Sequence, residues 1–206
     1  MARRRPVVFD IGNVLVRWDP GPAIATAVGS RRAEAFLADE AFGFAGWNHA
    51  MDEGRGPTWA EAERDAMRRF PHYAEEIVAY RRNFTTSLVG AVDGTAEIVH
   101  ELHRGEVPLY ALTNWSAELW HHAPERFEVL HLFDDIIVSG VEGVAKPDPR
   151  IWEVLADRMG RGVAGVTFVD DSPRNVESAL AAGMDAILFT GAVDLRAALR
   201  ARGHAL

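Results

Sequence analysis

Four short polar segments of this sequence, each directly after an apolar run, carry side chains that suit a divalent cation and a phosphoryl group. Carboxylate oxygens are the ligands that Mg²⁺ prefers, and hydroxyl, backbone N–H and ammonium groups bind phosphate oxygens. In chain order the segments contribute Asp10 and Asn13; Thr113 and Asn114; Lys146; and Asp170 with Asp171. Unrelated turn residues would rarely fall in this order, so we expect one shared site.

Taken singly, several of these residues have an ordinary structural explanation. Asp10 can simply begin a turn, although a carboxylate at a strand end can also attack phosphorus as a nucleophile. Thr113 and Asn114 are residue types that cap helices, although a hydroxyl and backbone N–H groups at a helix start also suit a phosphate oxygen. The case for a site therefore depends on the combination.

Lys146 and the Asp170-Asp171 pair are the more specific signals. Lys146 is the only lysine in the chain, because the other 21 of the 22 basic residues are arginines, and the proline after it favours an extended backbone. Two adjacent carboxylates repel each other unless a cation compensates them. Ser172 and Pro173 are an expected N-cap and first helical residue, which would end the strand and let both carboxylates approach one ion.

The apolar runs predict an α/β fold. Continuous Val, Ile, Leu and Phe are typical of strands covered on both faces, and helical patterns between the later runs predict βαβ units in a parallel sheet. The expected strands are residues 6–10, 107–113, 135–139, 165–170 and 185–190. The expected helices of the core are residues 95–104, 116–126, 149–159 and 173–182.

The interval between the first strand and residue 95 shows no comparable strand and mainly helical patterns, at residues 22–28, 31–39, 59–69 and 73–88. An irregular loop of that length is improbable in a compact domain, so we expect an inserted helical domain. The insert leaves the core at the carboxyl end of the first strand, which is the edge where open α/β sheets bind ligands. It can therefore cover the site.

The segments FDIGNVLVRWDP, ALTNWS, GVAKPDPRIW and FVDDSPRNVESALAAG resemble the four signature regions of the haloacid dehalogenase-like (HAD) hydrolase superfamily, in a phosphatase-like branch with a helical cap. The resemblance covers the core from about Pro6 to Gly191, and the cap matches mainly by position. It implies a Rossmann-like parallel sheet core, residues 1–15 and 92–206, with an α-helical cap at residues 16–91. It also implies Mg²⁺-dependent hydrolysis of a small, sugar-phosphate-like monoester through an aspartyl-phosphate on Asp10.

The same resemblance assigns roles to the four segments. It implies catalytic roles for Asp10, Thr113 and Lys146, Mg²⁺ binding by Asp10, the Gly12 carbonyl, Asp170 and Asp171, and phosphate binding by Asn13, Thr113, Asn114 and Lys146.

The sequence departs from the family at Gly12, where the phosphatases usually have a second aspartate that protonates the leaving group and then activates water. A glycine carbonyl can still bind a metal, but it cannot transfer a proton. Proton transfer by a positioned side chain typically raises the rate of such a reaction by ~10²–10⁴. Asp19, His49 and Asp52 are the candidates to replace it, unless a good leaving group needs no acid.

The cap segment 42–54, FGFAGWNHAMDEG, combines aromatic and polar side chains, which suits a sugar-sized ligand. Phe42 and Phe44 are better explained as the interior of a small helical bundle. The cap residues expected to contact substrate are Trp47, His49 and Asp52. In the core, Trp115 is expected to line the pocket entrance or to pack under the cap.

Other functions fit part of the pattern. A 2-haloacid dehalogenase also uses an aspartate nucleophile and needs no proton for halide departure, but it has no use for the metal arrangement of Asp170 and Asp171. A catalytically weakened protein that binds a phosphorylated metabolite is consistent with Gly12. A phospho-accepting receiver module would place its acidic pair early in the chain and would lack a cap of this size.

Composition limits the class of partner. The net charge of −8 argues against nucleic acid and anionic membranes, which need clustered Lys and Arg. No apolar run reaches the ~20 residues of a membrane span, and the basic start MARRRP lacks the apolar stretch of a signal peptide. The absence of cysteine excludes disulfides and is compatible with a reducing cytosol. We therefore expect a cytoplasmic monomer or homodimer acting on a small phosphorylated metabolite.

Overall fold

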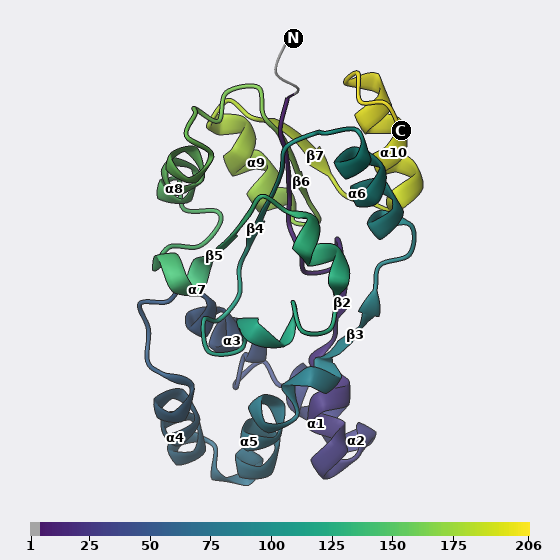
Figure 1. Ribbon diagram of the computed structural model, residues 1–206. Helices are drawn as coiled ribbons and strands as arrows, with labels where there is room; N and C mark the ends of the chain where they lie inside the picture. Colours follow the sequence, from purple (N-terminus) through teal and green to yellow (C-terminus); the bar gives the residue numbers. More distant parts are fainter. Residues whose placement is uncertain (1–4) are drawn as a thin grey trace.

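The computed structural model describes residues 5–206 and contains a five-stranded parallel sheet with the first strand at its centre (Figure 1). The spatial order is β5-β4-β1-β6-β7. The strands are β1 (Val7–Phe9), β4 (Leu109–Thr113), β5 (Asp135–Val138), β6 (Thr167–Asp170) and β7 (Asp185–Leu188). All five expected strands are confirmed. The expectation about a signal peptide depended partly on residues 1–4, which lie outside the described residues.

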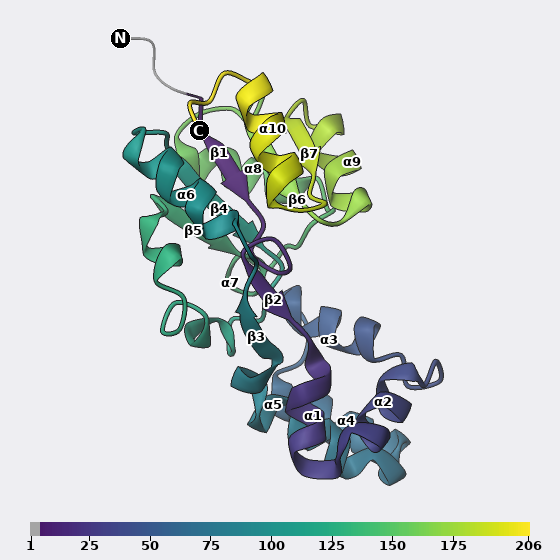
Figure 2. The ribbon, with the colours of Figure 1, turned by 90° about the vertical axis from the view of Figure 1, so that its right-hand side faces the viewer.

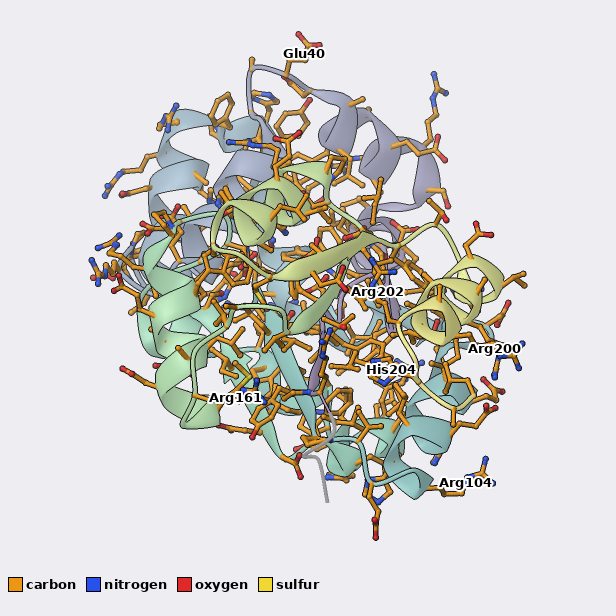
Figure 3. All side chains as sticks on the ribbon, turned by 90° about the horizontal axis from the view of Figure 1, so that it is seen from above. Glu40, Arg104, Arg161, Arg200, Arg202 and His204 are labelled. Carbon is orange, nitrogen blue, oxygen red and sulfur yellow. The ribbon has the colours of Figure 1, made fainter. Side chains whose placement is uncertain are left out.

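Helices cover both faces of this sheet because its apolar side chains alternate between the two faces. Val7 and Phe9 pack in one cluster with α6 (Thr95–Arg104) and α10 (Ala192–Ala201), whereas Val8 packs in a second cluster with α8 (Arg150–Met159) and α9 (Pro173–Ala181). Figure 3, seen from the end of the core away from the cap, shows Arg104 and Arg200 projecting outward from α6 and α10. These guanidinium groups lie at the periphery, far from the buried centre of the sheet.

The segment 116–126 is not the single helix that the sequence predicts. It forms turns and a short 3-10 helix at Trp120–His122, and another 3-10 helix follows at Glu128–Leu132. Pro124 has no N–H to donate within a helix, which accounts for the early stop. A short helix, α7 (Ser139–Glu142), follows β5, and α10 lies beyond the helices that the sequence pattern indicated.

The expected helical insert is present and packs around aromatic side chains. It contains α1 (Pro20–Val28), α2 (Ser30–Ala38), α3 (Phe44–Asp52), α4 (Trp59–Arg69) and α5 (Ala74–Arg82), with 3-10 helices at Pro71–Tyr73 and Phe84–Ser87. The ring centroids of Phe36 and Phe42 lie 4.5 Å apart and those of Phe44 and Tyr80 5.1 Å apart, as expected for a bundle interior. The helix predicted at 73–88 is shorter, because α5 ends at Arg82.

Two short antiparallel strands, β2 (Val16–Trp18) and β3 (Leu88–Ala91), join the core to the helical insert and run side by side in Figure 2. The expectation that this interval contains no strand is therefore wrong. The pairing joins segments about seventy positions apart, for example Val16 with Ala91, and each strand alone is too short to show a clear pattern. The expected domain limits, 16–91 for the cap, fall on this pair and stay a prediction.

Within residues 5–206, no helix is both long enough and apolar enough to cross a bilayer.

Candidate active site

Three neighbouring strands end at one edge of the sheet and bring three of the predicted segments together. Asp10 directly follows β1, Thr113 ends β4 and Asp170 ends β6, and β1 pairs with both β4 and β6. The chain leaves β1 for β4 and β5 on one side and then crosses to β6 and β7 on the other. The crevice at such a reversal is where open α/β sheets bind ligands.

Lys146 brings the remaining segment into the same place. Its side chain is 1% exposed, and Nζ donates hydrogen bonds to Asp10 Oδ1 at 2.8 Å, to Asp170 Oδ2 at 2.7 Å and to the Leu112 carbonyl at 2.7 Å. All three ammonium hydrogens can thus be used. The single lysine of the chain is a buried bridge between two carboxylates, not a solvated surface residue.

Asp170 is the most firmly held carboxylate of the cluster. It is fully buried, and its Oδ1 accepts hydrogen bonds from the Ser172 backbone N–H at 2.8 Å and from Asn175 Nδ2 at 3.0 Å. Ser172 and Pro173 begin α9 as predicted. Asn175 was not among the predicted site residues, because an asparagine in the first turn of a helix carries no signal of its contact with Asp170.

Asp10, Asp170 and Asp171 each offer a carboxylate oxygen, and these oxygens lie within 4.8 Å of one another. Burial raises the pKa of Asp10 to about 7 against the attraction of Lys146, and the charge of Asp170 adds to the rise. Burial and the charge of Asp170 also raise the pKa of Asp171. One ammonium thus faces three carboxylates, so the cluster fits a divalent cation bound by oxygen ligands.

Asn114 and Asn13 hold the backbone beside this cluster. The Asn114 side chain pairs with the backbone of Lys146, donating from Nδ2 to its carbonyl at 2.8 Å and accepting from its N–H at 2.9 Å. Asn13 adopts a left-handed conformation, with φ of 55°, and its Oδ1 accepts a hydrogen bond from the Trp18 N–H at 3.1 Å. Both side chains position loops, and their predicted phosphate contacts, like that of buried Thr113, stay predictions.

A cavity lies between this edge of the sheet and the cap. Gly12 and Asn114 place it beside the carboxylate cluster. Its apolar wall is formed by Trp18, Trp59, Tyr80, Phe84, Trp115 and Leu119, and its other lining residues are Gly12, Asn48, Asp52, Asn114 and Ser116.

Only some of the residues predicted to contact substrate line this cavity. Asp52 and Trp115 line it. Trp47 instead lines a separate hollow in the cap, with its ring centroid 5.3 Å from that of Trp59. The side chain of His49 is 46% exposed, with Nε2 lying 3.5 Å from a carboxylate oxygen of Glu53. The structure therefore brings Asp52 and Trp115 to the site, but not Trp47 or His49.

Polar contacts that the sequence did not reveal hold the cap against the core. Trp59 Nε1 donates to Ser116 Oγ at 2.8 Å, and the Trp59 N–H donates to Glu118 at 2.9 Å. Ser139 Oγ donates to the Asp52 carbonyl at 2.5 Å. Each contact joins residues more than fifty positions apart, so no local pattern could have indicated it.

The curated proteins to which this chain is similar include phosphatases. The chain is similar to the sesquiterpene phosphatase astK of Aspergillus oryzae, with 27% identity over 196 residues and 90% coverage of each protein. It is also similar to phosphoglycolate phosphatase of Escherichia coli O157:H7, with 27% identity over 206 residues, covering 90% of this chain and 81% of that protein.

A similar fold occurs in the HAD family enzyme BT-2542 of Bacteroides thetaiotaomicron, solved with magnesium and inorganic phosphate. The TM-score is 0.71 at 21% identity, covering 91% of this chain and 95% of that one. The sequence model described as haloacid dehalogenase-like hydrolase matches residues 5–183. With its parallel sheet, helical cap and acidic cluster around a buried lysine, the chain belongs to the haloacid dehalogenase-like hydrolase family.

Proposed function

We propose that this protein is a Mg²⁺-dependent phosphatase that hydrolyses a small phosphate monoester through an aspartyl-phosphate on Asp10. The supporting observation is the buried Lys146 ammonium, which bridges Asp10 and Asp170 while Asp171 completes a group of three converging carboxylates. An aspartate beside a cation site and an ammonium matches the needs of phosphoryl transfer, where positioning and charge stabilisation supply most of the catalysis.

In this mechanism the residues of the chain divide the work. Asp10, the Gly12 carbonyl, Asp170 and Asp171 would hold Mg²⁺, which when bound offsets negative charge on the phosphoryl oxygens. Lys146 favours the ionised form of Asp10 and would then stabilise the phosphoryl group as it transfers. Thr113, Asn114 and Asn13 would place the remaining phosphoryl oxygens.

The cap would control access to the site. We propose that residues 16–91 form the cap and that it moves about the β2–β3 pair, opening for substrate and excluding water when closed. The contacts of Trp59 with Ser116 and Glu118 would hold the closed arrangement.

Two classes of leaving group fit the lining of the cavity. The asparagine and aspartate side chains of the cavity suit a sugar phosphate, as the sequence predicted. Its six apolar lining residues favour a second candidate, the phosphate of an apolar alcohol such as a terpene alcohol. Two relatives, a sesquiterpene phosphatase and a phosphoglycolate phosphatase, are named for an apolar and a small acidic leaving group.

A panel of sugar, small-acid and prenyl monophosphates, assayed with Mg²⁺ and with EDTA, tests the proposal. We expect phosphate release that requires Mg²⁺ and is lost in Asp10→Asn while the fold is kept. An Asp10→Asn variant that retained most of its activity would refute the nucleophile assignment.

The same assays address the two rival functions. Halide release from 2-haloacids that is insensitive to EDTA would support a dehalogenase instead. Mg²⁺-dependent binding of a phosphorylated compound without turnover would support a binding protein.

A further inference from the structure

Gly12 leaves the first motif without a group that can transfer a proton, and the structure separates the three candidates to replace it. Asp19 caps α1, with Oδ1 accepting the Gly21 N–H at 2.8 Å, and it does not line the cavity. His49 is half-exposed, lies near Glu53 and is also absent from the lining. Asp52 lines the same cavity as Gly12.

The position of Asp52 is set by contacts between the end of α3 and the core. Its backbone carbonyl accepts a hydrogen bond from Ser139 Oγ at 2.5 Å. Two residues later, Gly54 approaches so closely that an added Cβ would lie 2.4 Å from the Gly140 carbonyl oxygen. Asn48, one helical turn earlier, donates from Nδ2 to Asp52 Oδ2 at 3.1 Å. A cap residue is thus held at the core edge with its carboxylate oriented.

We propose that Asp52, supplied by the cap, is the catalytic proton donor and acceptor that replaces the missing aspartate at position 12. This inference rests on the proposed phosphatase function. The cavity that holds Asp52 begins beside the Asp10 cluster, where the oxygen of a leaving group would emerge from a phosphoryl group bound there. Recruitment from the cap also means that the acid is present only when the cap is closed.

The proposed reaction has two steps, and Asp52 donates a proton in the first and accepts one in the second. As an Asp10 oxygen bonds to phosphorus, the bond from phosphorus to the ester oxygen breaks, and that oxygen keeps the electron pair and takes the proton of the Asp52 carboxyl group. The Asp52 carboxylate then accepts a proton from water as the water oxygen bonds to phosphorus and the Asp10–phosphorus bond breaks. The products are the alcohol and inorganic phosphate, and both aspartates return to their starting states.

The surroundings of Asp52 suit this exchange. Burial raises its pKa to about 7, against a hydrogen bond from the Ser116 backbone, so both protonation states are populated near neutral pH, where acid–base groups are most effective. Tyr80 is the titratable side chain that faces it from α5, and burial raises the pKa of Tyr80, which keeps the phenol neutral. The Tyr80 phenol therefore adds no charge beside the Asp52 carboxyl group.

The test compares two substrates on Asp52→Asn. An alkyl phosphate needs a proton on its leaving oxygen, whereas p-nitrophenyl phosphate releases a stable anion. We expect kcat/KM for the alkyl phosphate to fall by ~10²–10⁴, and that for p-nitrophenyl phosphate by less than about tenfold. Because the ratio of the two values is measured on one preparation, partial loss of folded protein cancels.

Two further variants make the test specific. In Asp52→Asn, the added change Gly12→Asp should restore alkyl phosphate turnover, because a Cβ at Gly12 would have only Asp10 Oδ2 nearby, at 4.0 Å. The control Asp19→Asn, a change that keeps a good helix cap outside the cavity, should leave the ratio unchanged.

Equal losses on both substrates, or no loss on either, would refute the role of Asp52. A failure of the phosphatase proposal itself would look different, because neither substrate would be hydrolysed by the unmodified protein, or Asp10→Asn would remain active.

Discussion

Replacing Lys146 with methionine removes the ammonium that bridges Asp10 and Asp170 while keeping a side chain of similar length. The structure assigns three hydrogen bonds to that ammonium, two of them to carboxylates. Both aspartates stay buried in the variant, so the change leaves their charges without the compensation that the lysine supplied. We expect a large loss of stability, well beyond that of an ordinary surface mutation.

The magnitude follows from the burial of the group. Removing one partner of a buried ion pair costs about 3–5 kcal/mol, and in a chain of 206 residues each kcal/mol lowers Tm by roughly 2–4 °C. The attraction of Asp10 and Asp170 raises the pKa of Lys146 even though burial opposes it. The stability that this raised pKa reflects is fully present below the ordinary pKa of lysine and is lost only in strong alkali. The ammonium therefore carries its full charge at neutral pH.

The loss should shrink as the pH falls. Burial already raises the pKa of Asp10 to about 7 in the presence of the lysine, and removing the ammonium raises that pKa further. A carboxyl group whose pKa is raised by folding gains stability as the pH falls below that pKa toward its ordinary value near 4. The loss therefore shrinks between the higher pKa of Asp10 in the variant and about pH 7. At about pH 5 Asp10 is neutral in both proteins, and the remaining loss no longer depends on its charge.

Guanidinium unfolding in EDTA, followed by circular dichroism at about pH 9 and pH 5, measures both effects. The matched control is Arg158→Met, whose guanidinium pairs with Asp135 and Glu142 but whose side chain is 43% exposed, so it should cost about 1 kcal/mol or less. Added Mg²⁺ should recover part of the loss in the lysine variant only. If Lys146→Met cost no more than the control without metal, the buried bridge would not be the electrostatic centre of the site.

The remaining predictions concern backbone placement around the site. Asn114→Ala removes the reciprocal pair with the backbone of Lys146, so we expect a loss of about 1–3 kcal/mol in chemical unfolding and reduced kcat; unchanged kcat would argue against its positioning role. Gly140→Ala would bring a Cβ within 2.4 Å of the Ala117 N atom and should lower Tm clearly, unlike Gly162→Ala, where the Cβ meets nothing within 4 Å. Thr58→Ala breaks the capping box of α4 and should cost about 1 kcal/mol in calorimetry without altering kcat; an altered kcat would mean that this helix start reaches the site.

Much of the fold and of the site could be predicted because the signals are local. Buried strands show as continuous apolar runs of a few residues, so β1, β4, β5, β6 and β7 were found. The chemistry of the site was visible for a similar reason, since polar side chains directly after buried strands must lie at one edge of a parallel sheet. The sequence could therefore identify Asp10 and Asp170 from their places at strand ends, and Lys146 as the only lysine of the chain, before their contacts were known.

Other features escaped the sequence where a local pattern was absent or misleading. Residues 116–126 have a helical pattern, but Pro124 and the packing of the cap against Ser116 favour turns. The strands β2 and β3 are short and meet only because the chain returns from the cap. Asn175 contacts Asp170 through the turn between β6 and α9, which no spacing rule indicates.

The sequence by itself determined which chemical groups this protein has and which ends of its strands carry them. Only the tertiary structure decided that Lys146 lies between Asp10, 136 positions away, and Asp170, and that Asp52, not His49 or Trp47, reaches the cavity. The physical reason is the range of the forces involved. Backbone periodicity and capping act over one or two turns, whereas burial, charge compensation and docking of the cap depend on surfaces that meet only after the whole chain has packed.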